Sequence, residues 1–280
     1  MDPQILKEQG FEYVEQGEGP ILLLLHGLFG ALSNFRDLFE TFSRDYKVMI
    51  PILPIYSETE VEASVSGLTS YVEDFVEYKG IKKCTLIGNS LGGHISLVFS
   101  LRRPEWVSSV VLTGSSGLFE SGMGTGFPRR SNYDFIQERV GFTFYDPKTA
   151  TKELVDEVFE IFMDNYKTLR IIKVARSAQR HNMADDLHKI EVPVLLIWGL
   201  NDNITPPHVA HEFNKLLPNS ELSSESALSC SSPLITDLSI TAAFRSGFSL
   251  LFLNSLISFA GTLGFSAPAK KMEVGSFKTS

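Results

Sequence analysis

The sequence has little of what marks several common classes of protein. Cysteine occurs only twice, as Cys84 and Cys230, far apart and without the spacing of metal ligands, which excludes a disulfide-stapled scaffold. No run of five or six lysines or arginines occurs, and the net charge of −8 argues against nucleic acid as the main partner and favours small-molecule ligands. The first 20 residues lack the basic-then-apolar pattern of a secretory signal, so we expect a cytoplasmic protein.

Histidine is absent from the C-terminal fifth of the chain, where serine is abundant. All six histidines lie before residue 212, whereas residues 222–280 contain 14 of the 31 serines. The same 59 residues carry only seven charged side chains. The composition therefore changes abruptly near Leu222, and the segment that follows supplies no imidazole to any active site.

Apolar runs and amphipathic segments alternate along the rest of the chain. Short apolar runs, several of them ending at glycine, are typical of strands buried on both faces of a sheet. The runs lie at residues 21–25, 47–50, 84–87, 107–113 and 192–198, and helical patterns separate them at 33–43, 64–78, 92–101 and 208–217. This alternation predicts an α/β fold with a mostly parallel sheet flanked by helices.

The alternation stops between the last two of these strands. A glycine-rich opening there leads into helical patterns at residues 152–165 and 169–179, which indicates an insertion. We therefore expect four parts: the first part of a core at 1–117, an inserted helical segment at 118–185, the second part of the core at 186–221, and a divergent serine-rich tail at 222–280.

A G-x-S-x-G motif, Gly88-Asn89-Ser90-Leu91-Gly92, follows the third apolar run and opens a helical pattern. Strand, tight turn and helix in this order form a nucleophile elbow, in which glycines let strand and helix approach and a strained serine is exposed at the tip. The helix N-terminus beneath the serine favours developing negative charge. We therefore predict Ser90 as a nucleophile; a glycine-serine turn without chemistry is the alternative.

A second glycine-containing loop, H-G-L-F-G at residues 26–30, follows the first apolar run. Attack of a serine on a carbonyl creates negative charge that backbone N–H groups can stabilise. We expect the N–H groups of Leu28 and Leu91 to form this oxyanion hole, and His26 to be a hydrogen-bonded structural residue of the loop. An ordinary strand-to-helix turn is the alternative.

These two motifs and the later W-G-L-N-D segment at residues 198–202 occur in an order that resembles the α/β-hydrolase fold superfamily. The resemblance covers about residues 10–221, and residues 118–185 correspond to the variable helical cap of that superfamily. It implies a serine hydrolase, similar to esterases, thioesterases and hydrolases of carbon–carbon bonds. Such an enzyme cleaves a small carbonyl-containing ester, thioester, amide or C–C substrate through an acyl-enzyme on Ser90, without a metal or organic cofactor.

The resemblance also implies a role for Asp202, which follows the last apolar run. In the superfamily a buried carboxylate at this strand end orients the catalytic histidine and stabilises the imidazolium that forms as serine loses its proton. A helix cap or Asx turn ahead of Pro206 and Pro207 is the alternative. We predict Asp202 as the catalytic acid.

The histidine that should follow Asp202 is missing. In the superfamily it lies on a loop after one more strand, but only His208 and His211 remain in this part of the chain. We expect both to face solvent and His94, four residues after Ser90, to pack within its helix. A serine without a base keeps its proton at neutral pH and is a poor nucleophile.

Three interpretations follow from the missing base: a hydrolase with impaired activity or an unconventional base, a non-catalytic binding protein with a hydrolase fold, and a frameshifted or truncated hydrolase without activity. The compositional change near Leu222 favours a frameshift or an alternative end, with the last strand and helix of the fold replaced. Residues 246–269 are uncharged and long enough to span a bilayer. Serines and glycines dilute their apolar character, so we do not expect a membrane anchor.

Overall fold

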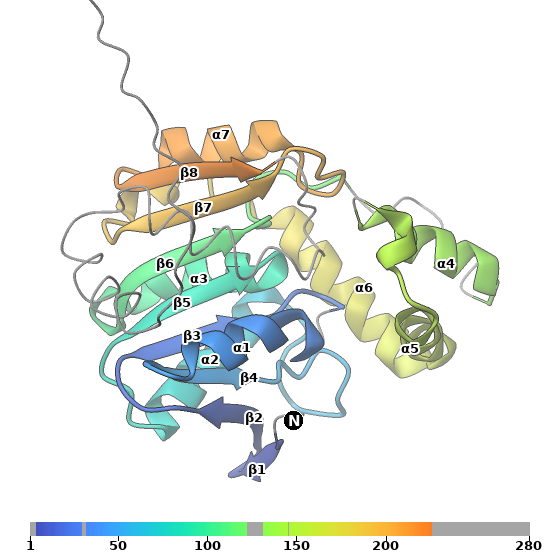
Figure 1. Cartoon of the computed structure of the whole chain (residues 1–280), viewed down its shortest axis with the longest axis horizontal. Helices are drawn as coiled ribbons and strands as arrows, with labels where there is room; N and C mark the ends of the chain where they lie inside the picture. The colour runs from blue at the N-terminus through green and yellow to red at the C-terminus, as the bar shows by residue number, and fades with distance from the viewer. Residues whose placement is uncertain (1–3, 30–31, 122–130, 145, 226–280) are drawn as a thin grey trace, which may run out of the picture.

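An eight-stranded sheet organises the computed structural model, which describes residues 4–29, 32–121, 131–144 and 146–225 (Figure 1). The strands are β1 (Leu6–Glu8), β2 (Phe11–Gln16), β3 (Ile21–Leu25), β4 (Lys47–Pro51), β5 (Cys84–Asn89), β6 (Val107–Thr113), β7 (Val194–Gly199) and β8 (Ser220–Glu225). Their spatial order is β1-β2-β4-β3-β5-β6-β7-β8. All pairs from β4 to β8 are parallel, and β1 and β2 form an antiparallel edge, which confirms the predicted α/β class.

Helices connect the parallel strands and cover both faces of the sheet. The α-helices are α1 (Arg36–Phe42), α2 (Val65–Tyr78), α3 (Leu91–Arg102), α4 (Tyr133–Phe142), α5 (Lys152–Met163), α6 (Asn165–Arg180) and α7 (Pro207–Leu216). Short 3-10 helices are η1 (Leu32–Phe35), η2 (Pro104–Trp106), η4 (Pro147–Thr149) and η5 (Leu187–Lys189). The helical patterns of the sequence correspond to α1, α2, α3, α5, α6 and α7.

The apolar strands are buried on both sides, as the sequence predicted. Leu23 and Leu25 of β3 pack in a core with α2, α3 and α7, while Leu22 and Leu24 pack against α1 on the opposite face. Figure 1 shows α1 in front of the sheet and α2 and α3 behind it. Because successive side chains of a strand point to opposite faces, burial of both faces requires an unbroken apolar run.

Three helices, α4, α5 and α6, lie between β6 and β7 in the chain, and we call them the inserted helices. Helices α4 and α5 share a small apolar core, which includes Ile136, Val155 and Phe162. Helix α6 also packs into the main core through Ile171 and Val174. In Figure 1, α4 and α5 stand to one side of the sheet and α6 lies between them and the sheet.

The serine-rich segment begins inside a strand. Strand β8 pairs in parallel with β7 along its whole length, from Ser220 opposite Val194 to Glu225 opposite Gly199. The compositional change near Leu222 therefore falls within the sheet. The predicted replacement of the last helix and the uncharged run at residues 246–269 lie outside the described residues. Among the helices of the described ranges, none is long and apolar enough to cross a membrane.

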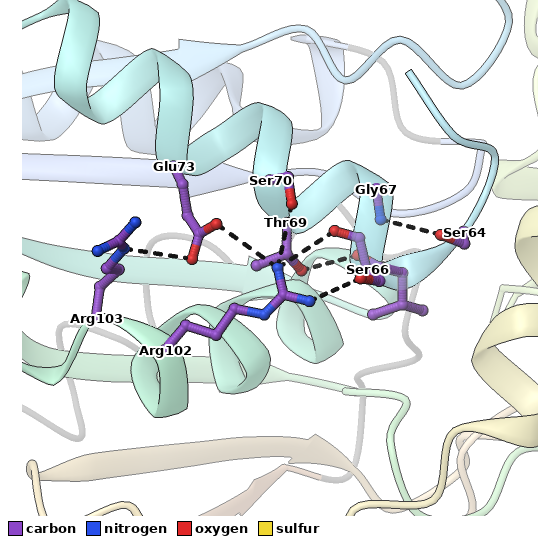
Figure 2. Close-up of polar contacts among 9 residues, drawn as sticks. Ser64, Ser66, Gly67, Thr69, Ser70, Glu73, Arg102 and Arg103 are labelled. Carbon is purple, nitrogen blue, oxygen red and sulfur yellow. Dashed lines mark hydrogen bonds and ion pairs between the residues drawn. The ribbon is translucent and has the colours of Figure 1, made fainter. Parts of the chain in front are cut away.

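A polar cluster joins α2 to the end of α3 (Figure 2). Arg102 of α3 donates hydrogen bonds to the hydroxyl groups of Ser66 at 2.7 Å and Ser70 at 3.3 Å, both on α2. Its guanidinium also lies 3.6 Å from the Glu73 carboxylate, which Arg103 approaches at the same distance. These contacts are partly exposed, so each contributes little free energy, but together they fix α3, the helix that begins immediately after Ser90.

Candidate active site

Ser90 has the strained backbone that a nucleophile elbow requires. Its φ of 51° and ψ of −114° lie outside the backbone regions that non-glycine residues favour. Among the non-glycine residues that the structure describes, only Gln9 also has a positive φ. The Ser90 N–H donates to the carbonyl of Thr113 at 3.0 Å, and its own carbonyl accepts from the Ser116 N–H at 3.2 Å. The end of strand β6 and the segment that follows it thus hold the strained turn in place.

The glycines of the elbow are required by close backbone contacts. A Cβ on Gly92 would overlap the backbone of Leu25 and lie 2.9 Å from the carbonyl oxygen of His26. A Cβ on Gly88 would lie 2.6 Å from the Cα of Gly93. Helix α3 therefore starts directly against the ends of β3 and β5, and only glycine fits at these positions.

The loop that follows β3 lies against Ser90. A Cβ on Gly27 would be 3.4 Å from the Cβ of Ser90 and 3.2 Å from Oδ1 of Asn89, so the backbones of the two loops nearly touch. Leu28 is the next residue, and Leu91 is the first residue of α3, whose N–H has no partner within the helix. The arrangement brings together the loops of the predicted oxyanion hole, and the pairing of Leu28 with Leu91 stays a prediction.

His26 is a structural residue of this loop, as the sequence indicated. Its ring is buried, its Nε2 accepts the backbone N–H of Leu53 at 3.0 Å, and its Nδ1 lies 2.9 Å from the carbonyl oxygen of Gly27. Since Nε2 accepts, Nδ1 carries the proton and donates it to Gly27. Burial lowers the pKa of His26, which keeps the ring neutral. The hydrogen bond fixes the Gly27–Leu28 peptide, which carries the Leu28 N–H.

Asp202 is buried on the loop after β7 and bonds within that loop. Its Oδ1 accepts the backbone N–H groups of Ile204 and Thr205, each at 2.8 Å, and its Oδ2 accepts the Thr205 hydroxyl at 3.0 Å. These are the turn contacts of the alternative interpretation. They also hold the carboxylate rigidly at the carboxyl edge of the sheet, where a catalytic acid belongs, so its role in orienting a histidine stays a prediction.

His94 donates its backbone N–H to the carbonyl of Ser90, but its side chain bonds to another histidine. His94 is fully buried, and its Nε2 lies 2.8 Å from Nδ1 of His181 at the end of α6. Burial, with a smaller contribution from His181, lowers the pKa of His94 to about 3, so it stays neutral. His208 and His211 are exposed on α7, as expected. Within the described ranges no group of three His, Cys, Asp or Glu side chains is arranged to hold a metal.

Glu120 is a residue of this region that the sequence did not reveal. The segment after β6 first contacts the elbow, where Ser116 donates to Ser90, and then the Asp202 loop, where the Ser121 N–H donates to the Ile204 carbonyl at 2.7 Å. Glu120 lies between these two contacts and is half-buried, and burial raises the pKa of its carboxyl to about 7. No local pattern marks this glutamate, because its burial depends on the folded arrangement of the chain and not on its sequence neighbours.

Replacing Glu120 by glutamine should stabilise the protein at alkaline pH. Because the pKa of Glu120 is about 7 in the folded chain and about 4.5 in the unfolded chain, its ionisation favours unfolding as pH rises between these values. Glu120→Gln removes this cost, so we expect a gain of up to roughly 3 kcal/mol in unfolding free energy at pH 8 and less than about 1 kcal/mol at pH 5. Urea denaturation at both pH values measures it.

The matched control for this prediction is Glu105→Gln, which changes an exposed glutamate of η2. We expect the control to leave the difference between the two pH values unchanged. An equal gain for Glu120→Gln at pH 5 and pH 8 would show that the carboxyl is not held neutral by burial.

The strand order and the elbow at the end of β5 define a class of protein, the α/β hydrolases, and known proteins agree. The profile of the family described as alpha/beta hydrolase fold matches residues 20–157. An α/β hydrolase enzyme from a sediment metagenome of the Mar Chica lagoon, Morocco, has a solved structure with 37% sequence identity and a TM-score of 0.69, covering 86% of this chain and 98% of that one. The chain belongs to the α/β-hydrolase fold family.

Curated relatives extend the comparison to most of the chain. An uncharacterised hydrolase of Bacillus subtilis is 27% identical over 232 residues, which cover 76% of this chain and 84% of the relative. The 2-hydroxy-6-oxo-6-phenylhexa-2,4-dienoate hydrolase of Comamonas testosteroni is 27% identical over 217 residues, 69% of this chain and 75% of that enzyme. Both relatives are hydrolases, which supports a hydrolytic function for this chain.

Proposed function

We propose that this protein is a serine hydrolase that cleaves a small ester, thioester, amide or carbon–carbon bond through an acyl-enzyme on Ser90. The observation that carries the proposal is the strained φ of 51° at Ser90, held between a buried strand and a helix N-terminus. Strain of this kind costs free energy and persists where function requires it. Similarity to the 2-hydroxy-6-oxo-6-phenylhexa-2,4-dienoate hydrolase of Comamonas testosteroni supports keeping the C–C bond among the substrate classes.

In the proposed reaction, Ser90 Oγ attacks the substrate carbonyl carbon while the N–H groups of Leu28 and Leu91 stabilise the negative oxygen. The tetrahedral intermediate then expels the leaving group, which takes up a proton, and leaves an ester on Ser90. Water attacks this ester and releases the acid. Asp202 would orient a histidine if one were supplied, and the inserted helices would form the cap that selects the substrate.

The proton of Ser90 needs an acceptor, and the side-chain contacts of the described histidines lie elsewhere. We propose that the proton passes to solvent, so that turnover is slow. The rate should then keep rising with pH, whereas a rate that depends on a histidine base levels off above the pKa of the imidazole. The alternative is a non-catalytic binding protein, which the turn contacts of Asp202 and the absence of histidine after His211 favour.

Translating the encoding DNA in its other two frames after codon 222 tests a frameshift. If a frameshift occurred, one of these frames should encode a strand, a Gly-His pair and a helix.

Turnover of p-nitrophenyl acetate and p-nitrophenyl butyrate tests the proposed function. We expect p-nitrophenol release in proportion to protein concentration, saturation with substrate, and a rate that rises about tenfold per pH unit between pH 6 and pH 8, as expected for proton transfer to hydroxide. Release no faster than with the same amount of urea-unfolded protein would support the non-catalytic binding protein.

A further inference from the structure

The loop that follows β4 is bonded to the predicted oxyanion loop at two points. The Leu53 N–H donates to His26 Nε2 at 3.0 Å, and the Tyr56 hydroxyl donates to the carbonyl of Leu28. His26 fixes the peptide before Leu28, and Tyr56 fixes the peptide after it. Since peptides are planar, these two hydrogen bonds determine the direction in which the Leu28 N–H points. Burial raises the pKa of Tyr56, so its hydroxyl stays a donor.

The same loop after β4 is held on its other side by Arg170 of α6. The Arg170 side chain is only 8% exposed; its Nε donates to the carbonyl of Ile55 at 3.1 Å, and its Nη2 donates to the carbonyls of Pro54 at 2.9 Å and Val61 at 3.1 Å. Three hydrogen bonds from one planar, charged group are directional and strong. The guanidinium therefore fixes residues 54–61 relative to the inserted helices.

A direct contact also joins the oxyanion loop to the inserted helices. The ring centroid of Phe29, the residue after Leu28, lies 5.7 Å from that of Phe162 on α5, and Phe29 packs against the apolar core of α4 and α5. Residues on both sides of the proposed N–H donor are thus tied to α5 and α6, directly through Phe29 and indirectly through Tyr56 and Arg170.

We propose that Tyr56 and Arg170 are positioning residues that couple the oxyanion loop to the inserted helices, so that the oxyanion hole is complete only while α5 and α6 are seated on the sheet. The coupling itself is structural; its effect on catalysis rests on the proposed function. A substrate that fits beneath the inserted helices leaves the Leu28 N–H in place, whereas one that pushes them away weakens stabilisation of the oxyanion. The inserted helices would then select substrates through the rate of the chemical step as well as through binding.

Amide hydrogen exchange measured by mass spectrometry tests this coupling without requiring activity. In Tyr56→Phe, which removes only the hydroxyl group, we expect about tenfold faster exchange in the peptide that contains residues 26–29, because loss of one hydrogen bond changes an equilibrium by about that factor. Arg170→Gln should accelerate exchange in residues 26–29 and 52–61 alike. Arg170→Lys keeps the charge but loses the planar fork, and should lie between Arg170→Gln and the wild type.

The control is Tyr133→Phe, which removes a hydroxyl that bonds to Asp156 inside the inserted helices. It should leave exchange in residues 26–29 unchanged. Where wild-type protein turns over p-nitrophenyl butyrate, Tyr56→Phe should lower kcat about tenfold with KM within about twofold, since the hydrogen bond acts on the transition state.

Unchanged exchange of residues 26–29 in Tyr56→Phe would overturn the coupling, as would equal acceleration across the whole chain, which reports general destabilisation. If Arg170→Gln does not fold, Tyr56→Phe alone decides the outcome. A wild-type protein without turnover contradicts the proposed function, and hydrogen exchange still decides whether the coupling exists. The two proposals therefore fail in distinguishable ways.

Discussion

Replacing Ser90 by alanine is expected to reduce protein-dependent hydrolysis of p-nitrophenyl butyrate by about 100-fold to 1,000-fold. Without Oγ no acyl-enzyme can form, and what is left comes from binding and from the N–H groups of the oxyanion hole. The expected loss is smaller than for a complete triad. Nucleophile and base act as a unit, so a chain that already lacks the base has lost part of the rate that the serine supplies.

Ser116→Ala is the matched control for this change. Ser116 also lies beside the elbow, where its N–H donates to the carbonyl of Ser90, but in the described structure its buried hydroxyl has no hydrogen-bond partner. Removing this hydroxyl keeps the backbone hydrogen bond, so turnover should stay within about twofold of the wild type. Equal rates for Ser90→Ala and the wild type would exclude Ser90 as the nucleophile.

Gly92→Ala should prevent the protein from folding or leave it barely stable. The added methyl group would overlap the backbone of Leu25, and backbone atoms of a central strand cannot move aside as a flexible side chain can. We expect a loss of about 4 kcal/mol or more in unfolding free energy, which is a large part of the stability of an ordinary domain. Soluble yield and the thermal unfolding midpoint measure the effect.

The control is Gly141→Ala, which adds the same methyl group near the end of α4. There the nearest atom, Cβ of Pro147, would be 3.4 Å away, an ordinary contact distance. Because alanine has a higher helix propensity than glycine, this change should be neutral or stabilise by up to about 1 kcal/mol. Equal stability of Gly92→Ala and Gly141→Ala would contradict the close contact between α3 and β3.

Much of the fold was predictable because its elements depend on short-range patterns. The apolar run at residues 107–113 coincides with β6, and the run at 21–25 with β3. The sequence patterns do not reveal β1 and β2: β1 is largely polar and exposed at the sheet edge, and polar residues interrupt the apolar pattern of β2 although Tyr13 and Val14 are buried. Helix α4 was also missed, because it buries few residues and follows the glycine-rich opening of the insertion.

The candidate site was predictable only where its residues form local motifs. The elbow and the loop at residues 26–29 each carry their own glycine pattern, and the structure places them in contact. Tyr56 and Arg170 are different, because their contacts join segments up to 116 residues apart in sequence. The same holds for the His94–His181 pair, which no local sequence pattern predicts. Contacts of this kind exist only once the sheet and the inserted helices have assembled.

The central claim, that Ser90 is the nucleophile of this chain, is tested most directly by mass spectrometry after reaction with a fluorophosphonate. The phosphonate forms a stable bond to a serine oxygen and releases fluoride, so it reports attack by serine without requiring turnover. We predict one adduct per chain, located on the peptide that contains Ser90 and absent from Ser90→Ala. An unlabelled wild-type chain, or a label that persists in Ser90→Ala, would contradict the claim.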